Sequence, residues 1–405
     1  MGCIVRISCV GAGSAGLYFS ILAKLRNPEH EITVYERRAA GSSYGWGVSF
    51  GPDLVQKLYA NDPESAREIE DSTLRWRTQS VDIHGKNVSY AGSVDVYNIN
   101  RPRLVEILGV RAQQLGVKIC YGEEITSPTQ VPDSDLIVAA DGLNSRIREA
   151  VGKFGTVRVP TTDRYIWLGT QQPAAAPAYH YIRTDCGWIW GCIYGVPADL
   201  STFVVHCTQE TWIALGFDTK SIVESISLIS EIFKEQLNGH RLIGQVGDET
   251  NARWLSFQSV HNQRWHEGNI ALIGDCAHGT HFTAGLGTTL AVEDAMALVA
   301  SLDRYENLES ALQAYGAERS AQVSPFQEQA RRSGQWFVDV SRYIDLEPNQ
   351  FTTLLHARRS SLLPHLPPRV YYLIRRIRQN RQIHQIRQIS RKVVPVVKAI
   401  YTDAR

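Results

Sequence analysis

A glycine-rich turn near the start of the chain has the residue types and the spacing that bind a dinucleotide. Its residues are Gly11, Gly13, Ser14, Ala15 and Gly16, in the pattern G-x-G-x-x-G. Glycine permits a tight turn and lets the backbone approach a pyrophosphate, and the free N–H groups of a following helix attract the phosphates. Glu36 lies 20 residues after Gly16 and can accept hydrogen bonds from ribose hydroxyls, while the adjacent Arg37 can lie over adenine or phosphate. The motif predicts a site for the ADP half of NAD or FAD.

The elements around this turn fit such a site. Residues 4–10 form an apolar run typical of a buried strand, residues 17–25 have apolar side chains at helical spacing, and residues 31–36 predict a second strand. A turn between a strand and a helix points the positive helix end at the ligand. We therefore expect the α/β fold class, with a Rossmann-like cofactor-binding domain.

Two later motifs place carboxylates at the ends of predicted strands. The strand at 135–140 ends in Asp141, within D-G-x-x-S-x-x-R, and the strand at 269–274 ends in Asp275. A carboxylate at a strand end can accept a hydrogen bond from a sugar hydroxyl, and the alternative for Asp275 is a cap of the following helix. The loop after Asp275 contains Gly285, Leu286, Gly287 and Thr288 and opens a predicted helix. The positive end of that helix would stabilise an anionic group.

These three segments resemble the fingerprints of the class A flavoprotein monooxygenases, the aromatic hydroxylases related to p-hydroxybenzoate hydroxylase. The resemblance covers roughly residues 1 to 320. It implies FAD as the cofactor, Asp141 as a support for the pyrophosphate, Asp275 on the ribityl chain, and NADPH or NADH as the reductant. Arg101 matches the arginine that contacts FAD in the family's R-x-x-L-x-x-x-L helix. Arg103 and an ordinary solvated helix face are the alternatives at this position.

The segment after Asp275 departs from the commonest family pattern, because His281 and Phe282 stand where many members have two prolines. With the loop around Trp46, this segment looks like the branch that includes salicylyl-CoA and 2-aminobenzoyl-CoA hydroxylases. The resemblance implies oxygen transfer from a flavin C4a-hydroperoxide, made with O2, to an electron-rich aromatic ring. It also suggests an aryl thioester on coenzyme A or a carrier protein as the substrate.

The implied reaction is helped by a base with a pKa near neutral, because a phenol or aniline must lose a proton. His281 is the candidate catalytic residue, since its loop is expected beside the flavin. The competing interpretation is a structural imidazole bonded to a backbone carbonyl. His180 and His206, on predicted strands, are weaker candidates for the base.

The middle of the chain predicts a mixed β-sheet substrate domain. Strands are expected at 178–182, 187–194 and 202–208, and a helix at 221–237. Aromatic side chains from such a sheet can line a pocket for a flat ring, although each of them can equally belong to the core. The candidate substrate-binding residues are Trp46, Trp188, Trp190, Tyr194, His206 and Phe282.

The charge of the chain is unevenly divided, although its net charge is only +1. From Arg369 to Arg405 there are ten basic residues and one acidic residue, which gives +9 and leaves −8 on the rest. Apolar residues recur at helical spacing among these arginines, as in a basic amphipathic helix. Such a helix either docks on the acidic body or meets an acidic partner or membrane surface. The overall balance gives no reason to expect nucleic-acid binding.

Four segments follow from these patterns. We expect the first part of the FAD-binding domain at 1–150, the substrate domain at 151–258, the second part of the FAD-binding domain at 259–345, and a basic helical segment at 346–405. The seven cysteines have no C-x-x-C spacing, so no metal site is predicted and a reducing cytoplasm is the expected location. No run approaches the roughly 18 apolar residues of a transmembrane segment.

Three other functions compete with aromatic hydroxylation. Gly187-Trp188-Ile189-Trp190 resembles part of the flavin-dependent halogenase signature, but the expected Ile-Pro does not complete it. A non-hydroxylating oxidoreductase, such as a simple NAD(P)-dependent dehydrogenase, would leave the Asp275 motif without a role. A flavin-binding protein without turnover has the same cofactor motifs.

Overall fold

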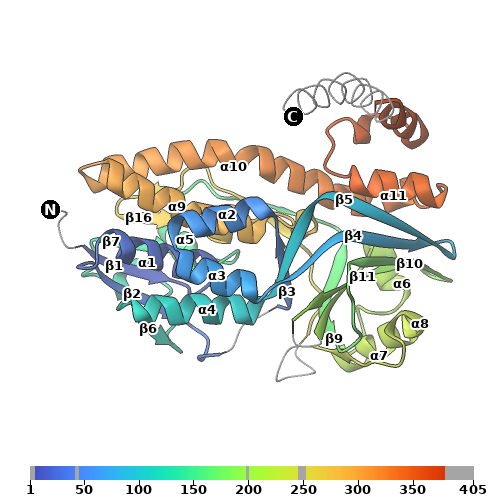
Figure 1. The fold of residues 1–405 in the computed structure, drawn as a ribbon, viewed down its shortest axis with the longest axis horizontal. Coiled ribbons are helices and arrows are strands. Elements are labelled where there is room, and N and C mark those ends of the chain that lie inside the picture. Colours follow the sequence, from blue (N-terminus) through green and yellow to red (C-terminus); the bar gives the residue numbers. More distant parts are fainter. Residues whose placement is uncertain (1–4, 42–44, 198–199, 245–251, 379–405) are drawn as a thin grey trace, which may run out of the picture.

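The structure is a computed structural model, and it describes residues 5–41, 45–197, 200–244 and 252–378. Two large sheets lie next to each other, and the long helix α10 (Leu308–Val338) runs across both of them (Figure 1). The predicted α/β fold class is confirmed. The two sheets correspond to the two predicted parts, because one carries the glycine and carboxylate motifs and the other carries the aromatic residues.

The first sheet has six strands and is parallel except at one edge. In spatial order its strands are β15 (His266–Glu267), β16 (Ile270–Leu272), β7 (Leu136–Ala139), β1 (Arg6–Val10), β2 (Glu31–Glu36) and β6 (Lys118–Tyr121). The chain leaves β1 toward β2 on one side, whereas β7 pairs with β1 on the other side. The carboxyl ends of these strands therefore form a topological switch point, where open α/β sheets bind their ligands.

The helices beside this sheet each bury one part of their surface and expose another, as expected for helices that cover a sheet. They are α1 (Ser14–Arg26), α2 (Pro52–Asn61), α3 (Pro63–Asp71), α4 (Arg101–Gln114), α5 (Arg146–Val151) and α9 (Gly287–Arg304). Apolar residues of the strands and of α1, α4 and α9 make one continuous core.

The second sheet has eight strands and is mostly antiparallel. In spatial order they are β13 (Leu242–Ile243), β9 (Arg164–Thr170), β12 (Leu200–Cys207), β11 (Gly187–Val196), β10 (Ala178–Thr184), β4 (Leu74–Ile83), β5 (Lys86–Asn100) and β3 (Gly47–Phe50). A further pair, β8 (Val157–Pro160) and β14 (Gln258–His261), lies outside both sheets. Since β3, β4 and β5 come from residues 47–100, the expected boundary at residue 150 does not coincide with sheet membership.

One face of the eight-stranded sheet is covered by three helices, α6 (Gln209–Ala214), α7 (Ile222–Ile232) and α8 (Lys234–Leu237). Alternate residues of the strands, such as Ile166, Ile189 and Phe203, pack with these helices. The single helix expected at 221–237 is divided at Phe233, which serves as the last cap of α7 and the first cap of α8.

The opposite face of this sheet packs against the C-terminal part of the chain. The end of α10, the helix α11 (Pro348–His356) and the segment to Tyr371 share a core with Tyr181 and Trp190. Residues 368–378 are helical, and the apolar side chains of Leu373 and Ile377 are exposed on them. The rest of the expected basic helix, residues 379–405, lies outside the described residues. Among the described helices, none is long and apolar enough to cross a membrane.

Candidate active site

The glycine turn lies at the end of β1, and its three glycines have different surroundings. A Cβ atom on Gly11, whose φ is +111°, would lie 2.4 Å from the carbonyl oxygen of Ala140, and one on Gly16 would lie 2.2 Å from that of Gly11. A Cβ atom on Gly13 would meet nothing within 4 Å. Gly11 and Gly16 are therefore needed for packing. Gly13 leaves open space before the first amides of α1, at Ser14 and Ala15, which fits a pyrophosphate.

Glu36, at the end of β2, holds this turn through backbone amides. Its carboxylate accepts hydrogen bonds from the N–H of Ala12 at 3.0 Å and of Arg38 at 3.0 Å. The side chain is half-buried, so it lies where a ribose beside the turn would meet it. Arg37 is exposed, and its guanidinium lies 3.7 Å from Glu124.

Asp275 follows β16, and it is exposed to solvent. Desolvation by the surrounding protein raises the pKa of Asp275, although the charges of His278 and Arg101 oppose the change. A Cβ atom on Gly287, the first residue of α9, would lie 3.9 Å from Oδ1 of Asp275. Gly285 has open space around it, and the nearby Leu286 and Thr288 are half-buried. An accessible carboxylate beside an arginine and a helix N-terminus fits the sugar chain and the ring of a flavin.

The structure distinguishes the two arginines at the start of α4. Arg103 pairs with Glu68 at 2.8 Å and with Glu106 at 2.9 Å, on the outer face of the helix. The positive charge of Arg101 instead lowers the pKa of Asp275, in opposition to desolvation. The side chain of Arg101 also lies close to Gly45. This placement favours Arg101 as the cofactor residue.

The Asp141 motif has a structural job that the sequence did not define. Asp141 accepts hydrogen bonds from the amides of Arg146 at 2.7 Å and Ile147 at 3.2 Å, at the start of α5. Arg148 is buried and donates to the carbonyl oxygens of Leu143 at 2.7 Å and of Cys276 at 2.8 Å. It thereby joins the Asp141 and Asp275 motifs at the same edge of the sheet.

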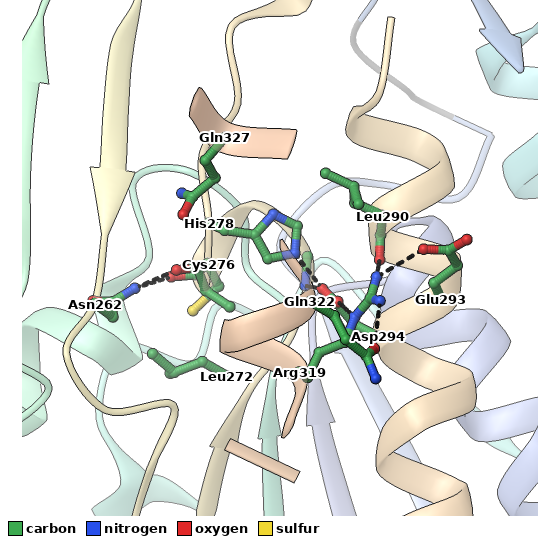
Figure 2. A network of polar contacts seen from close by, with 12 residues as sticks. Asn262, Leu272, Cys276, His278, Leu290, Glu293, Asp294, Arg319, Gln322 and Gln327 are labelled. Carbon is green, nitrogen blue, oxygen red and sulfur yellow. Dashed lines mark hydrogen bonds and ion pairs between the residues drawn. The ribbon is translucent and has the colours of Figure 1, made fainter. Parts of the chain in front are cut away.

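A second network, centred on Asp294, was missed by the sequence analysis (Figure 2). Asp294 of α9 is fully buried and accepts from the amide of Gly274 at 2.8 Å, from His278 at 2.5 Å and from Arg319 of α10 at 2.7 Å. Arg319 also donates to Glu293 at 3.0 Å. The acidic pair at 293–294 was visible in the sequence, but its cation lies on the next helix. We call the group His278, Glu293, Asp294 and Arg319 the helix network.

The face of the eight-stranded sheet that looks toward α10 carries rows of aromatic and polar residues. The strand register places Tyr165, His206, Trp190 and Tyr181 in one row and Trp167, Val204, Cys192 and Tyr179 in the next. Phe282 meets the first row, since its ring centroid lies 4.4 Å from that of Tyr165 and 5.2 Å from that of His206. The loop that leads to α9 therefore meets this aromatic face.

The other candidate substrate residues have varied surroundings. Trp46 is 1% exposed, and its indole N–H donates to the carbonyl oxygen of Gly244 at 3.2 Å. The hydroxyl of Tyr194 donates to the carbonyl oxygen of Gly47 at 3.1 Å, which fixes the strand after Trp46. Trp190 is buried beside Phe337, and Trp188 lies edge-on to His84. Tyr194, Trp190 and Trp188 share the aromatic face, whereas Trp46 fills the space above Gly169.

The ring of His281 stacks on that of Phe282. His281 belongs to a buried group that we call the imidazole cluster, which consists of Asp163, His206 and His281. Nε2 of His206 lies 3.3 Å and Nε2 of His281 lies 3.7 Å from the same oxygen of Asp163. The side chain of Asp163 has no exposed surface, and His281 is 2% exposed. Nδ1 of His281 lies 2.9 Å from the hydroxyl of Thr283. No sequence pattern marks Asp163, which lies just before β9.

Burial and charge act in opposite directions within this cluster. Desolvation raises the pKa of Asp163, but the two imidazoles and the hydroxyl of Thr161 outweigh it and lower the pKa to about 2. Desolvation lowers the pKa of His206 to about 4, in spite of the carboxylate beside it. Asp163 is thus an anion and His206 is neutral at neutral pH. No group of three or more side chains suited to a metal ion occurs in the described part of the chain.

Comparisons with known proteins indicate the family to which the chain belongs. Residues 97–330 match the family model described as FAD binding domain. The chain is 30% identical to salicyloyl-CoA 5-hydroxylase of a Streptomyces species over 84% of its own length and 66% of that protein. It is 32% identical to 3-hydroxy-4-methyl-anthranilyl-[aryl-carrier protein] 5-monooxygenase of Streptosporangium sibiricum, over 84% of its own length and 93% of that protein.

Solved structures support the fold. 2-Methyl-3-hydroxypyridine-5-carboxylic acid oxygenase superposes with a TM-score of 0.68 at 18% identity, over 89% of this chain and 94% of that one. A probable FAD-dependent monooxygenase from Pseudomonas aeruginosa superposes with a TM-score of 0.64 at 18% identity, over 84% and 98%. With its family match, its relatives and a site that fits FAD, the chain belongs to the FAD-dependent aromatic monooxygenases.

Proposed function

We propose that this protein uses NADH or NADPH and O2 to hydroxylate an electron-rich aromatic ring. The balanced reaction is Ar–H + O2 + NAD(P)H + H⁺ → Ar–OH + H2O + NAD(P)⁺. One observation carries the proposal: the loop at 281–287 joins the exposed Asp275 and the start of α9 to the aromatic face of the eight-stranded sheet. When bound, FAD supplies the acceptance of hydride and the activation of O2.

The protein's own residues bind, orient and exclude water in this proposal. Gly13, Asp275 and Arg101 hold the cofactor, and the first amides of α9 stabilise negative charge beside it. Phe282, with Trp190, Tyr194 and His206 on the sheet, forms the wall against which a flat ring lies. Trp188 on the sheet and Trp46, just before β3, complete the proposed wall. A closed aromatic wall keeps water away from the reacting oxygen.

The proton that leaves the ring substituent needs an acceptor. We assign the role of acceptor to His281, within the imidazole cluster. His206 is neutral and Asp163 is ionised, so the cluster can take up one positive charge beside an existing carboxylate. His281 is the member of this cluster that belongs to the cofactor loop.

The proposed substrate is an aryl thioester, on coenzyme A or on a carrier protein. Two relatives support it, because their names specify a salicyloyl-CoA and an anthranilyl-[aryl-carrier protein] substrate. The basic residues after Arg369 would suit an acidic carrier. We retain the cytoplasm as the proposed location, because the six cysteines within the described residues are all free.

The first experiment tests the reaction class. The purified chain should be yellow, with absorbance bands near ~370 and ~450 nm that NAD(P)H bleaches. Product analysis under ¹⁸O2 should show one labelled oxygen atom in the aromatic product. A protein that never takes up FAD, or that adds halide to the ring, would overturn the proposal.

A matched pair of variants tests the cofactor site. Gly13 and Gly51 both precede helices with extended backbone, at φ −81° and −88°, and a Cβ atom on either meets nothing within 4 Å. We expect Gly13→Val to weaken FAD binding at least tenfold, because the side chain enters the pyrophosphate space. Gly51→Val should retain FAD. Equal loss in both variants would show that the space before α1 is not the phosphate site.

The thioester requires a separate comparison. Turnover should be measured on one aromatic acid in three forms: free, as the coenzyme A thioester, and loaded on a carrier protein. We expect a higher kcat/KM for a tethered form. A preference for the free acid would exclude the thioester while leaving the hydroxylase intact.

A further inference from the structure

The imidazole cluster continues into a chain of polar contacts that ends in the C-terminal segment. Nε of Arg358 donates to the hydroxyl oxygen of Ser333 at 3.0 Å, and this hydroxyl lies 2.9 Å from that of Thr283. The Thr283 hydroxyl lies 2.9 Å from Nδ1 of His281, whose Nε2 faces Asp163. The contacts thus run from Arg358 through α10 and the cofactor loop to the substrate sheet.

The direction of this chain follows from its first donor. A guanidinium only donates hydrogen bonds, so the Ser333 hydroxyl accepts from Arg358 and is free to donate to Thr283. The Thr283 hydroxyl can then donate to Nδ1 of His281. The backbone N–H of Thr283, which cannot accept, also donates to this nitrogen, at 3.4 Å. Nδ1 of His281 is therefore an acceptor, and the ring proton belongs on Nε2, the nitrogen that faces the carboxylate.

Packing gives the imidazole no room to turn over. A Cβ atom on Gly334 of α10 would lie 2.6 Å from Cδ2 of His281, so glycine is required for this close approach. The rings of Phe282 and Phe257 lie with centroids 4.9 and 4.7 Å from that of His281. The ring is thus held between two aromatic groups and a helix backbone.

We propose that Asp163 is a positioning residue, whose buried carboxylate holds His281 in the Nε2–H tautomer and so fixes the 281–287 loop against the substrate sheet. The carboxylate does not touch the reacting atoms. It acts through His281 and through Phe282, the residue of the loop that meets the aromatic face. The catalytic consequence rests on the proposed hydroxylase function, whereas the tautomer is a property of the protein itself.

Asp82 and His180 provide a matched control on the same sheet. Their carboxylate and imidazole lie 3.6 Å apart, close to the separation between Asp163 and His281. They lie at β4 and β10, and His180 faces away from the row that contains Tyr181 and His206. Asp82→Asn therefore removes a carboxylate at a similar distance from an imidazole without touching the loop, at a position where the carboxylate side chain is 35% exposed.

The experiment is nitrogen NMR of the histidines in the ¹⁵N-labelled, FAD-loaded full chain near pH 7.5. His281→Gln assigns the His281 signals, and wild type is compared with Asp163→Asn, Thr283→Val and Asp82→Asn. We expect the Nε2–H tautomer of His281 in wild type and in Asp82→Asn, and a mixture of tautomers in Asp163→Asn. Thr283→Val should shift the Nδ1 signal, because that nitrogen loses the hydroxyl. An Nδ1–H tautomer or an imidazolium in wild type would overturn the proposal, as would an unchanged tautomer in Asp163→Asn.

The second readout is the fraction of NAD(P)H oxidation that yields hydroxylated product. A loosened loop misplaces the ring, so we expect Asp163→Asn to lower this fraction about tenfold and to leave KM within about twofold. A purely packing role would lower the Tm and leave both the tautomer and this fraction unchanged. If wild type does not hydroxylate any ring, the proposed function fails, and the NMR result still decides the role of Asp163.

Discussion

Two buried carboxylate–histidine groups lie on either side of the loop after Asp275, and they are built in opposite ways. In the helix network, Asp294 accepts from an amide, an imidazole and a guanidinium, and a second carboxylate accepts from the same guanidinium. In the imidazole cluster, the Asp163 oxygens have no hydrogen bond within the described residues, and they face two imidazoles at 3.3 and 3.7 Å. Both groups are buried, but only the first is saturated with donors.

The difference indicates different purposes. A buried charge is tolerated when donors satisfy it, so the helix network ties α9 and α10 to the end of β16 as a rigid support. A buried carboxylate that faces neutral His206 without a full set of hydrogen-bond donors is typical of places where a protein carries out chemistry. The loop at 281–287 joins the two groups. It is therefore fixed on its cofactor side by the helix network, and on its substrate side it contacts the imidazole cluster, whose carboxylate is not saturated with donors.

The largest effect is expected from breaking the helix network. Arg319→Met leaves Asp294 and Glu293 buried without their cation, and removal of one partner of a buried pair costs about 3–5 kcal/mol. Denaturant unfolding of the FAD-loaded protein would measure the loss. Arg304→Met is the control, because Arg304 pairs with Glu318 where both side chains are about half exposed, and such pairs contribute about 0–1 kcal/mol. Similar losses in the two variants would show that the network is no support.

A smaller, pH-dependent effect is expected from the imidazole cluster. The pKa of His206 is lowered from 6.5 to about 4, so the unfolded chain binds a proton that the folded chain rejects between these values. Stability contributed by neutral His206 is therefore present above pH 6.5 and is lost as pH falls toward 4, by about 2 kcal/mol between pH 7.5 and 5. Asp163 adds a further loss only when pH falls from 3.8 toward 2.

His206→Gln isolates this contribution. The difference in unfolding free energy between wild type and His206→Gln should shrink by about 2 kcal/mol when the pH is lowered from 7.5 to 5. Denaturant titrations at the two pH values give this difference directly, and other histidines cancel in the subtraction. A difference that stays constant with pH would mean that His206 is not held neutral.

The two groups also differ in how far the sequence reveals them. The glycine turn, the two strand-end carboxylates and the alternating aromatic strands depend on local spacing, so the fold class and the placement of these motifs at strand ends were predictable. Arg319 and Asp163 depend on partners that only the fold brings close. Asp294 meets Arg319 across two helices, and Asp163 meets His281 across two distant segments. Nothing in the residues around 163 distinguishes that carboxylate from an ordinary turn residue.

The smallest effect tests whether the buried Arg319, and not an exposed cation, stabilises the helix network. Lys57 of α2 lies 2.5 Å from Glu293, and its side chain is 50% exposed. Lys57→Met should cost no more than about 1 kcal/mol, because solvent screens an exposed cation and Arg319 still neutralises Glu293. The measurement is the same denaturant titration as for Arg319→Met. If Lys57→Met lowers the free energy of unfolding as much as Arg319→Met does, the exposed Lys57 stabilises the helix network as much as the buried Arg319. The contrast between the saturated Asp294 and the unsaturated Asp163 would then not explain the two sides of the loop.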